Sequence, residues 1–151
     1  MKIALGSDHA GYPLKKLIMD HLKKSGHELI DYGAPNGVDS ASYVPFAQQV
    51  AKAVQAKEVD FGILICGTGL GISITANKFK GIRAAIATNE YMARMARQHN
   101  NANILALGGR VVGSALAFAI VDAFLDEEFE AGGRHQVRVN EIMALEDENF
   151  K

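Results

Sequence analysis

Short apolar runs alternate along this chain with longer segments in which apolar residues return every three or four positions. The longer segments predict helices at about 13–25, 45–56, 71–78, 89–98, 114–125 and 135–145. The apolar runs predict strands at 2–5, 28–32, 61–65, 82–87 and 103–107. The run at 61–65 is almost wholly apolar, which is typical of a parallel strand covered on both faces. The alternation therefore predicts an α/β fold, a Rossmann-like three-layer sandwich with a five-stranded parallel sheet and helices on both faces.

The length and composition narrow the class of protein. A chain of 151 residues, 48% hydrophobic, is expected to form one domain (1–151), with the last helix, about 135–145, packing on it or on a partner subunit. A net charge of −1 indicates no nucleic-acid partner, and no apolar stretch reaches the roughly 20 residues that span a bilayer. The single cysteine forms no internal disulfide and favours a cytoplasmic location.

Chemically active side chains follow three of the predicted strands. In parallel sheets, ligands bind at the carboxyl ends of the strands, near the switch in strand order. Asp8 and His9 follow the first strand, Cys66 ends the third, and Arg110 follows the fifth. We therefore expect these residues to meet at one edge of the sheet.

Cys66 stands between a buried strand and a glycine-rich turn, in VDFGILICGTGLGISITANK at 59–78. A lone cysteine at the end of an apolar strand is usually an inert small side chain. Here it directly precedes a helix N-terminus, where the unpaired N–H groups and the dipole favour a thiolate and other anions. The position favours proton transfer on a carbonyl compound.

The glycine loop Gly67-Thr68-Gly69-Leu70-Gly71 has two further interpretations. It could be a tight strand-to-helix turn without a ligand, or the fingerprint of a dinucleotide site. Against the fingerprint, Ile72 occupies the place of the third glycine and the loop follows the third strand. In its favour, Glu90 lies at the distance expected of a ribose-binding acid.

Other polar residues have structural explanations as good as functional ones. Asp8 could cap the first helix. His99 and Asn100 close a helix, and His99 is expected at the end of the sheet opposite its own site, where it could serve a neighbouring subunit. Arg134 and Arg138 share a helix face and, with Arg110, could bind a phosphate. The remaining histidines are expected at the surface, and no cluster of histidines and carboxylates predicts a metal site.

Four segments together resemble the type B ribose-5-phosphate isomerases over nearly the whole chain. They are SDHAG at 7–11, ILICGTGLGISITANK at 63–78, RQHNNANILALGGRVVG at 97–113 and GGRHQVRV at 132–139. The resemblance implies an aldose–ketose isomerase of the pentose phosphate pathway that interconverts ribose 5-phosphate and ribulose 5-phosphate without a cofactor or metal.

The resemblance also implies a role for each matching residue. Cys66 matches the catalytic base and His99 the residue that opens the sugar ring. Thr68, close to the ring, and Asp8 complete the expected catalytic group. Some relatives use a glutamate where Ile72 stands here. The expected contacts to sugar, phosphate and enediolate oxygen come from Asp8, His9, Gly67, Thr68, Gly69, Leu70, Gly71, Asn100, Arg110, Arg134 and Arg138.

The resemblance further implies a homodimer or homotetramer whose sites are shared between subunits. His99 and Asn100, together with Arg110 in the same segment, would then reach the partner's site. The loop at 33–44 is expected to line the sugar end. Relatives that isomerise allose or galactose 6-phosphate leave a hexose phosphate as an alternative substrate, and a nucleotide-binding module is the alternative from another class.

Overall fold

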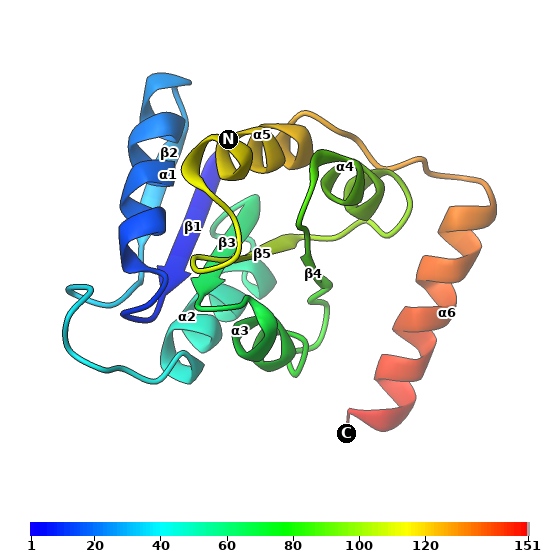
Figure 1. Cartoon of the computed structure of the whole chain (residues 1–151). Helices are drawn as coiled ribbons and strands as arrows, with labels where there is room; N and C mark the ends of the chain where they lie inside the picture. Colours follow the sequence, from blue (N-terminus) through cyan, green and yellow to red (C-terminus); the bar gives the residue numbers. More distant parts are fainter. Residues whose placement is uncertain (151) are drawn as a thin grey trace.

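A five-stranded parallel sheet forms the middle layer of the molecule (Figure 1), which the computed structural model describes over residues 1–150. The strands lie in the order β2-β1-β3-β5-β4, and every neighbouring pair is parallel. The chain therefore reverses its direction of winding between β1 and β3, which is where ligands bind in such sheets. The strands are β1 (Lys2–Ser7), β2 (Glu28–Asp31), β3 (Phe61–Cys66), β4 (Ala84–Ile86) and β5 (Ile104–Gly108).

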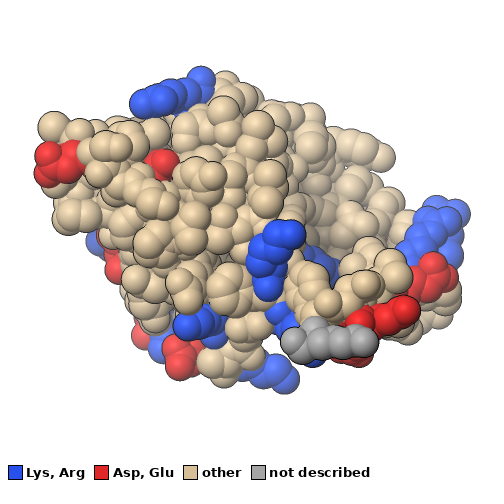
Figure 2. Space-filling view, turned by 90° about the horizontal axis from the view of Figure 1, so that it is seen from below, with Lys and Arg blue, Asp and Glu red and all other residues tan. Residues whose placement is uncertain are grey.

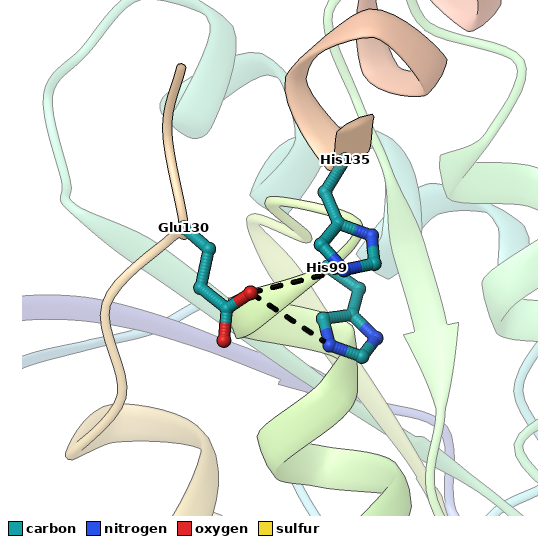
Figure 3. A group of neighbouring side chains, drawn as sticks. All are labelled: His99, Glu130 and His135. Atoms are coloured by element: carbon teal, nitrogen blue, oxygen red, sulfur yellow. Dashed lines mark ion pairs between the residues drawn. The ribbon is translucent and has the colours of Figure 1, made fainter. Parts of the chain in front are cut away.

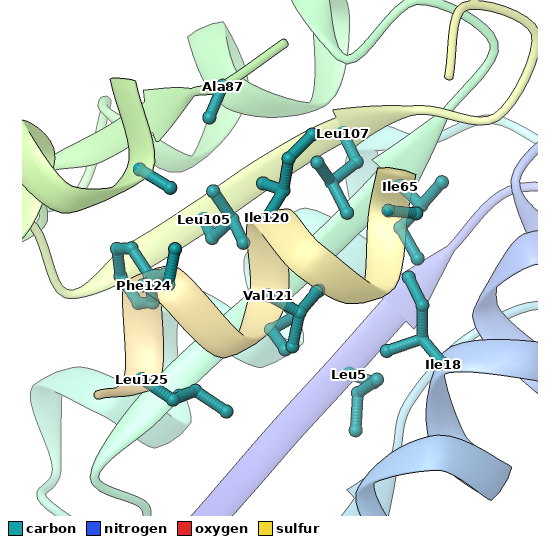
Figure 4. Packing of buried hydrophobic residues seen from close by; sticks show 14 of the residues in the cluster. Leu5, Ile18, Ile65, Ala87, Leu105, Leu107, Ile120, Val121, Phe124 and Leu125 are labelled. Atoms are coloured by element: carbon teal, nitrogen blue, oxygen red, sulfur yellow. The ribbon is translucent and has the colours of Figure 1, made fainter. Parts of the chain in front are cut away.

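Helices cover both faces of the sheet, as the sequence predicts. Buried residues of α1, α4 and α5 pack on one face, and those of α2 and α3 pack on the other. Figure 4 shows α5 lying across the first face, with Ile120, Val121 and Phe124 directed at the strands. The helices are α1 (Tyr12–Lys24), α2 (Val44–Gln55), α3 (Leu70–Ala76), α4 (Glu90–Gln98), α5 (Ser114–Leu125) and α6 (Arg134–Asn149).

The central strand β3 explains why its sequence is apolar throughout. Ile63 and Ile65 belong to the core under α1 and α5, whereas Leu64 and Cys66 belong to the core under α2 and α3. Successive side chains of a strand point to opposite faces, so a strand between two helical layers needs apolar residues at every position. Ile63, Leu64 and Ile65 are fully buried.

A close approach of two backbones sets the first loop beside the end of β3. A Cβ atom on Gly11 would lie 2.2 Å from the carbonyl oxygen of Ile65, so only glycine allows this approach. The contact places the start of α1 directly over the carboxyl end of β3. It thereby brings Asp8 and His9 next to Cys66.

Several local predictions differ from the structure. Strand β4 is shorter than the predicted 82–87, and α6 begins one residue earlier and ends four residues later than the predicted 135–145. Strand β4 lies at the sheet edge and pairs only with β5, and just beyond its end Ala87 N–H still donates to the carbonyl of Ala106 over 3.3 Å. Asn89 caps α4, because its side chain accepts a hydrogen bond from the N–H of Met92.

Helix α6 stands apart from the other helices (Figure 1) and lies beside the β4 edge of the sheet. Two hydrogen bonds join it to that edge: Gly81 N–H donates to Glu146 over 2.8 Å, and Arg83 donates to the sulfur of Met143 over 3.1 Å. A mainly apolar groove of about 500 Å³ remains between them. Whether α6 packs on its own domain or on a partner stays a prediction.

The view from below shows the side of the molecule toward which the strands run (Figure 2). On this face, basic and acidic side chains are scattered among uncharged ones instead of forming one continuous patch. Over residues 1–150, no helix has the length and apolar character to cross a membrane.

Candidate active site

A pocket of about 310 Å³ opens at the carboxyl ends of β1 and β3, at the switch in strand order. Its walls come from four segments: the loop after β1, the glycine loop after β3, the loop after β5, and the segment just before α2. The lining residues are Asp8, His9, Ala10, Tyr43, Cys66, Gly67, Thr68, Gly71 and Arg110.

The thiol of Cys66 forms the floor of this pocket. The side chain is buried, and its Sγ accepts a hydrogen bond from the backbone N–H of Gly69 over 3.1 Å. Gly69 has φ of +84°, a left-handed conformation that side chains other than glycine rarely adopt. This turn folds the N–H back onto the sulfur and fixes the direction of the thiol.

The rest of the glycine loop is fixed to the loop after β5. Gly109 N–H donates to the carbonyl of Cys66 over 2.8 Å, and Arg110 N–H donates to that of Gly67 over 3.0 Å. Leu70 N–H donates to Thr68 Oγ1 over 3.2 Å. These bonds hold the exposed Arg110 at the mouth of the pocket, beside the thiol.

Asp8 and His9 enter the pocket from the turn after β1. Asp8 is buried and accepts a hydrogen bond from Gly11 N–H over 2.9 Å. Gly11 is the residue just before α1, so this bond fixes the turn. It does not cap the helix, since a cap accepts from the N–H of the second or third helical residue. His9 Nδ1 accepts a hydrogen bond from Ala41 N–H over 3.1 Å. In the neutral ring this leaves the proton on Nε2, which can therefore donate to an anion.

Tyr43 belongs to the pocket although sequence reasoning did not single it out. Its ring lies against Gly71, where a Cβ atom would come within 2.4 Å of the ring carbon Cζ. The absence of a side chain at Gly71 thus admits Tyr43, and the predicted sugar-end loop 33–44 reaches the pocket through this residue. Tyr43 is the only aromatic residue of that loop, which is the signal that could have identified it.

The structure separates the predicted site residues into two groups. The first group lies at the pocket. Its lining members are Asp8, His9, Cys66, Gly67, Thr68, Gly71 and Arg110. Gly69 and Leu70 belong to the same glycine loop but do not line the pocket. The second group lies elsewhere in the same chain and comprises His99, Asn100, Arg134 and Arg138. Asn100 lines the groove beside α6, and the two arginines are exposed in the first turns of that helix.

His99 caps the C-terminus of α4 and lies in a cluster that the sequence did not predict (Figure 3). Its ring stacks on that of His135, with centroids 3.7 Å apart. Glu130 reaches both, with Oε2 4.0 Å from His99 Nε2 and 3.7 Å from His135 Nε2. The expectation that His135 is a surface residue is wrong, since its side chain is only 10% exposed.

The surroundings of His135 act on its ionisation. Burial lowers the pKa of His135, and the neighbouring His99, Arg134 and Arg138 lower it further, while Glu130 opposes them. The neutral ring is therefore favoured. Together the three clustered side chains present two imidazole nitrogens and a carboxylate within 4.8 Å of one another.

The doubly wound parallel sheet, with a thiol, an aspartate, a histidine and an arginine in one pocket at the carboxyl ends of its strands, places the chain in the class of open α/β proteins whose ligand sites lie at that edge of the sheet. The model of the ribose/galactose isomerase family matches residues 3–142. The chain belongs to this family.

Individual relatives cover almost the whole chain. It is 54% identical over 145 residues to ribose-5-phosphate isomerase B of Escherichia coli strain K12, covering 96% of each chain. Among solved structures, ribose-5-phosphate isomerase B of Clostridium thermocellum is 59% identical with a TM-score of 0.95, covering 98% of this chain and 99% of that one. The enzyme of Mycoplasma genitalium, with bound ribulose-5-phosphate, is 44% identical with a TM-score of 0.92, covering 98% and 97%.

Proposed function

We propose that this protein is an aldose–ketose isomerase that interconverts ribose 5-phosphate and ribulose 5-phosphate. The observation that carries the proposal is the buried Cys66 thiol, held by a backbone N–H in a pocket with Asp8, His9 and Arg110. Relatives that carry the name ribose-5-phosphate isomerase B match nearly the full chain, and one of them holds ribulose-5-phosphate.

Cys66 is the proposed base. In the open-chain aldose, the thiolate removes the proton on C2, and the carbonyl oxygen on C1 becomes an oxyanion. A proton then passes from the C2 hydroxyl to the C1 oxygen. The charge on the C2 oxygen collapses to the ketose carbonyl as the thiol returns the carbon-bound proton to C1. Ile72, at the position of the alternative glutamate base, is fully buried in the core, so the thiol is the ionisable group of this loop.

The backbone of the glycine loop is the proposed stabiliser of the enediolate oxygen. Donors that are already oriented before the reaction need no reorganisation as charge develops. The N–H groups of Gly69 and Leu70 donate to Cys66 and Thr68, respectively. The oxyanion would therefore depend on the other N–H groups of the loop, those of Gly67, Thr68 and Gly71.

The phosphate is the proposed ligand of His9 and the arginines. Arg110 lines the pocket. Ala41 N–H occupies Nδ1 of His9, which leaves Nε2–H of that ring available to the phosphate. Arg134 and Arg138 lie one turn apart at the start of α6 and would complete the phosphate site from a partner subunit. Binding energy from the phosphate orients the reacting carbons.

A homodimer or homotetramer with shared sites is the proposed assembly. His99 and Asn100, which do not line the pocket of their own chain, would act at the partner's pocket, where His99 opens the cyclic sugar. Two features support an interface at this side: the edge strand β4 and the exposed apolar residues of α6, Val137, Ile142 and Leu145. In this arrangement residues 1–151 form one domain, and α6 packs on the partner.

A hexose 6-phosphate is the second candidate substrate, because the matching family is described as containing both ribose and galactose isomerases. The width of the sugar end, at Tyr43, would decide between five and six carbons. The chemistry at Cys66 is the same for both. A catalytic thiol must stay reduced, so we assign the protein to the cytoplasm.

The test is a coupled assay of the purified protein in EDTA with ribose 5-phosphate, allose 6-phosphate and galactose 6-phosphate as separate substrates. Turnover of the pentose alone would support the proposed function. Preference for a hexose would keep the mechanism and change the substrate. No turnover of any of the three, by a protein shown to be folded and oligomeric, would contradict the isomerase assignment.

A further inference from the structure

The cluster of His99, Glu130 and His135 joins three separate elements (Figure 3). His99 ends α4, His135 is the second residue of α6, and Glu130 lies in the extended segment between α5 and α6. That segment is tied to α4, because Glu130 N–H donates to the carbonyl of Gln98 over 2.9 Å. The tie brings the Glu130 carboxylate to the two rings.

Two imidazoles and one carboxylate form a ligand set with a clear preference. Imidazole nitrogens favour Zn²⁺, Co²⁺, Ni²⁺ and Cu²⁺ over Mg²⁺ and Ca²⁺, which prefer oxygen ligands. Two histidines with one glutamate can hold Zn²⁺ and leave a further position for water. The chemistry of the cluster therefore selects a divalent transition-metal ion.

A small movement of the side chains would complete the site. The three ligand atoms lie within 4.8 Å of one another, and a tetrahedral Zn²⁺ with bonds of about 2.0–2.2 Å requires separations of about 3.3 Å. The stacked rings must also tilt. The nitrogen lone pairs of two parallel rings point in parallel directions, so without a tilt they do not converge on one ion. His99 is 32% exposed and Glu130 is 55% exposed, so both can move toward the more buried His135.

The charges nearby make the carboxylate essential. Arg134 and Arg138 are close enough to act on the ionisation of His135, and their positive charge opposes a cation. The carboxylate of Glu130 is the clustered group that offsets this repulsion.

We propose that His99, Glu130 and His135 bind a divalent transition-metal ion of the Zn²⁺ class, and that the bound ion withdraws His99 from sugar ring opening. The binding half stands on the cluster alone. The inhibitory half rests on the proposed function, since it requires that His99 opens the ring.

The binding half is tested by titrating the full chain, freed of metal with a chelator, with Co²⁺ and recording the visible absorption. We expect one Co²⁺ per chain with bands of nitrogen and oxygen ligation, and affinity lowered by at least about 10–100-fold in His135→Gln and in Glu130→Gln. Because the Glu130 side chain is exposed, its substitution leaves the fold intact, which far-UV circular dichroism verifies.

Two control variants distinguish this site from other ligands. Cys66→Ala removes the thiol, and His27→Gln removes a histidine outside the cluster, which lies just before β2 within 3.4 Å of the Met1 amine. Both should keep the Co²⁺ bands. Undiminished Co²⁺ binding in His135→Gln and Glu130→Gln would overturn the site. So would a wild-type spectrum with sulfur-to-metal charge-transfer absorption that disappears, together with Co²⁺ binding, in Cys66→Ala.

The inhibitory half is tested by measuring ribose 5-phosphate turnover with Zn²⁺ or Mg²⁺ added to the metal-free protein. Zn²⁺ should inhibit the wild type but not His135→Gln or Glu130→Gln, and Mg²⁺ should have no effect. Full turnover with the site occupied would overturn this half. No turnover in the metal-free wild type would overturn the isomerase assignment and the inhibitory role together, while the Co²⁺ titration would still decide the metal site.

Discussion

The backbone N–H of Gly69 donates a hydrogen bond to the sulfur of Cys66 over 3.1 Å. The turn between the two residues requires Gly69 to adopt the left-handed backbone conformation. The bond fixes the direction of the thiol. It also removes this N–H from the donors available to substrate. Because Cys66 is the proposed base, the first prediction concerns its substitution.

Cys66→Ala should lower kcat by at least about 10²–10⁴-fold, the usual contribution of a general base, and leave the fold intact. Binding of inorganic phosphate should persist because His9 and Arg110 remain in place. Kinetics with ribose 5-phosphate and phosphate protection against thermal unfolding measure the two effects. Cys66→Ser, which keeps the shape but is a weak base, is the matched control and should also be nearly inactive. Near-normal kcat in either variant would contradict the proton-transfer role.

His99→Asn should impair reaction from the cyclic sugar more than proton exchange on an open-chain substrate. The physical reason is that ring opening needs a proton donor and acceptor, whereas exchange at C1 and C2 needs only the base. Turnover of ribose 5-phosphate and solvent-hydrogen exchange into ribulose 5-phosphate, which is open-chain, separate the two steps. Equal losses in both assays would show that His99 has no specific part in ring opening.

Arg138→Ala should raise KM for ribose 5-phosphate by roughly 10-fold or more with a smaller change in kcat. An arginine contact to phosphate, a charge-assisted hydrogen bond, is worth roughly 1.5–3 kcal/mol and is made alike in ground and transition states. Arg138→Lys should recover part of the loss, because it keeps the charge without the two-pronged geometry. A large fall in kcat at unchanged KM would argue against a phosphate contact.

Gly71→Ala should displace the ring of Tyr43 without unfolding α3. The new methyl group would lie 2.4 Å from the ring carbon Cζ, whereas alanine is a better helix former than glycine by about 0.5–1 kcal/mol. We therefore expect unchanged or higher thermal stability together with weaker substrate binding, and Tyr43→Ala should not add to that loss of binding. Unchanged KM in Gly71→Ala would remove Tyr43 from the site.

Gly11→Ala should destabilise the whole domain. Its Cβ would lie 2.2 Å from the carbonyl oxygen of Ile65, a backbone atom that cannot move without distorting β3. Overpacking of this kind costs typically about 1–3 kcal/mol. Urea denaturation at fixed protein concentration measures it, and Gly113→Ala, which has open space around it, is the control expected to change stability by less than about 1 kcal/mol. Equal stability of the two variants would contradict the close approach.

The sequence by itself determined the elements and one half of the site. The apolar run of β3 and the helical spacing of α5 are short-range patterns, and they sufficed to predict five parallel strands between helices. Because the carboxyl ends of parallel strands share one edge, the same pattern placed Asp8, His9, Cys66 and Arg110 together, and the structure has them in one pocket.

Only the tertiary structure decided the contacts between residues far apart in the chain. Tyr43 lies against Gly71 and His99 stacks on His135, although no local pattern links the members of either pair. Such contacts depend on how separate helices and loops pack, whereas periodicity reports only which face of one element is buried. For that reason the sequence indicated the thiol and its glycine loop, while the aromatic wall of the pocket and the histidine cluster emerged only in the folded chain.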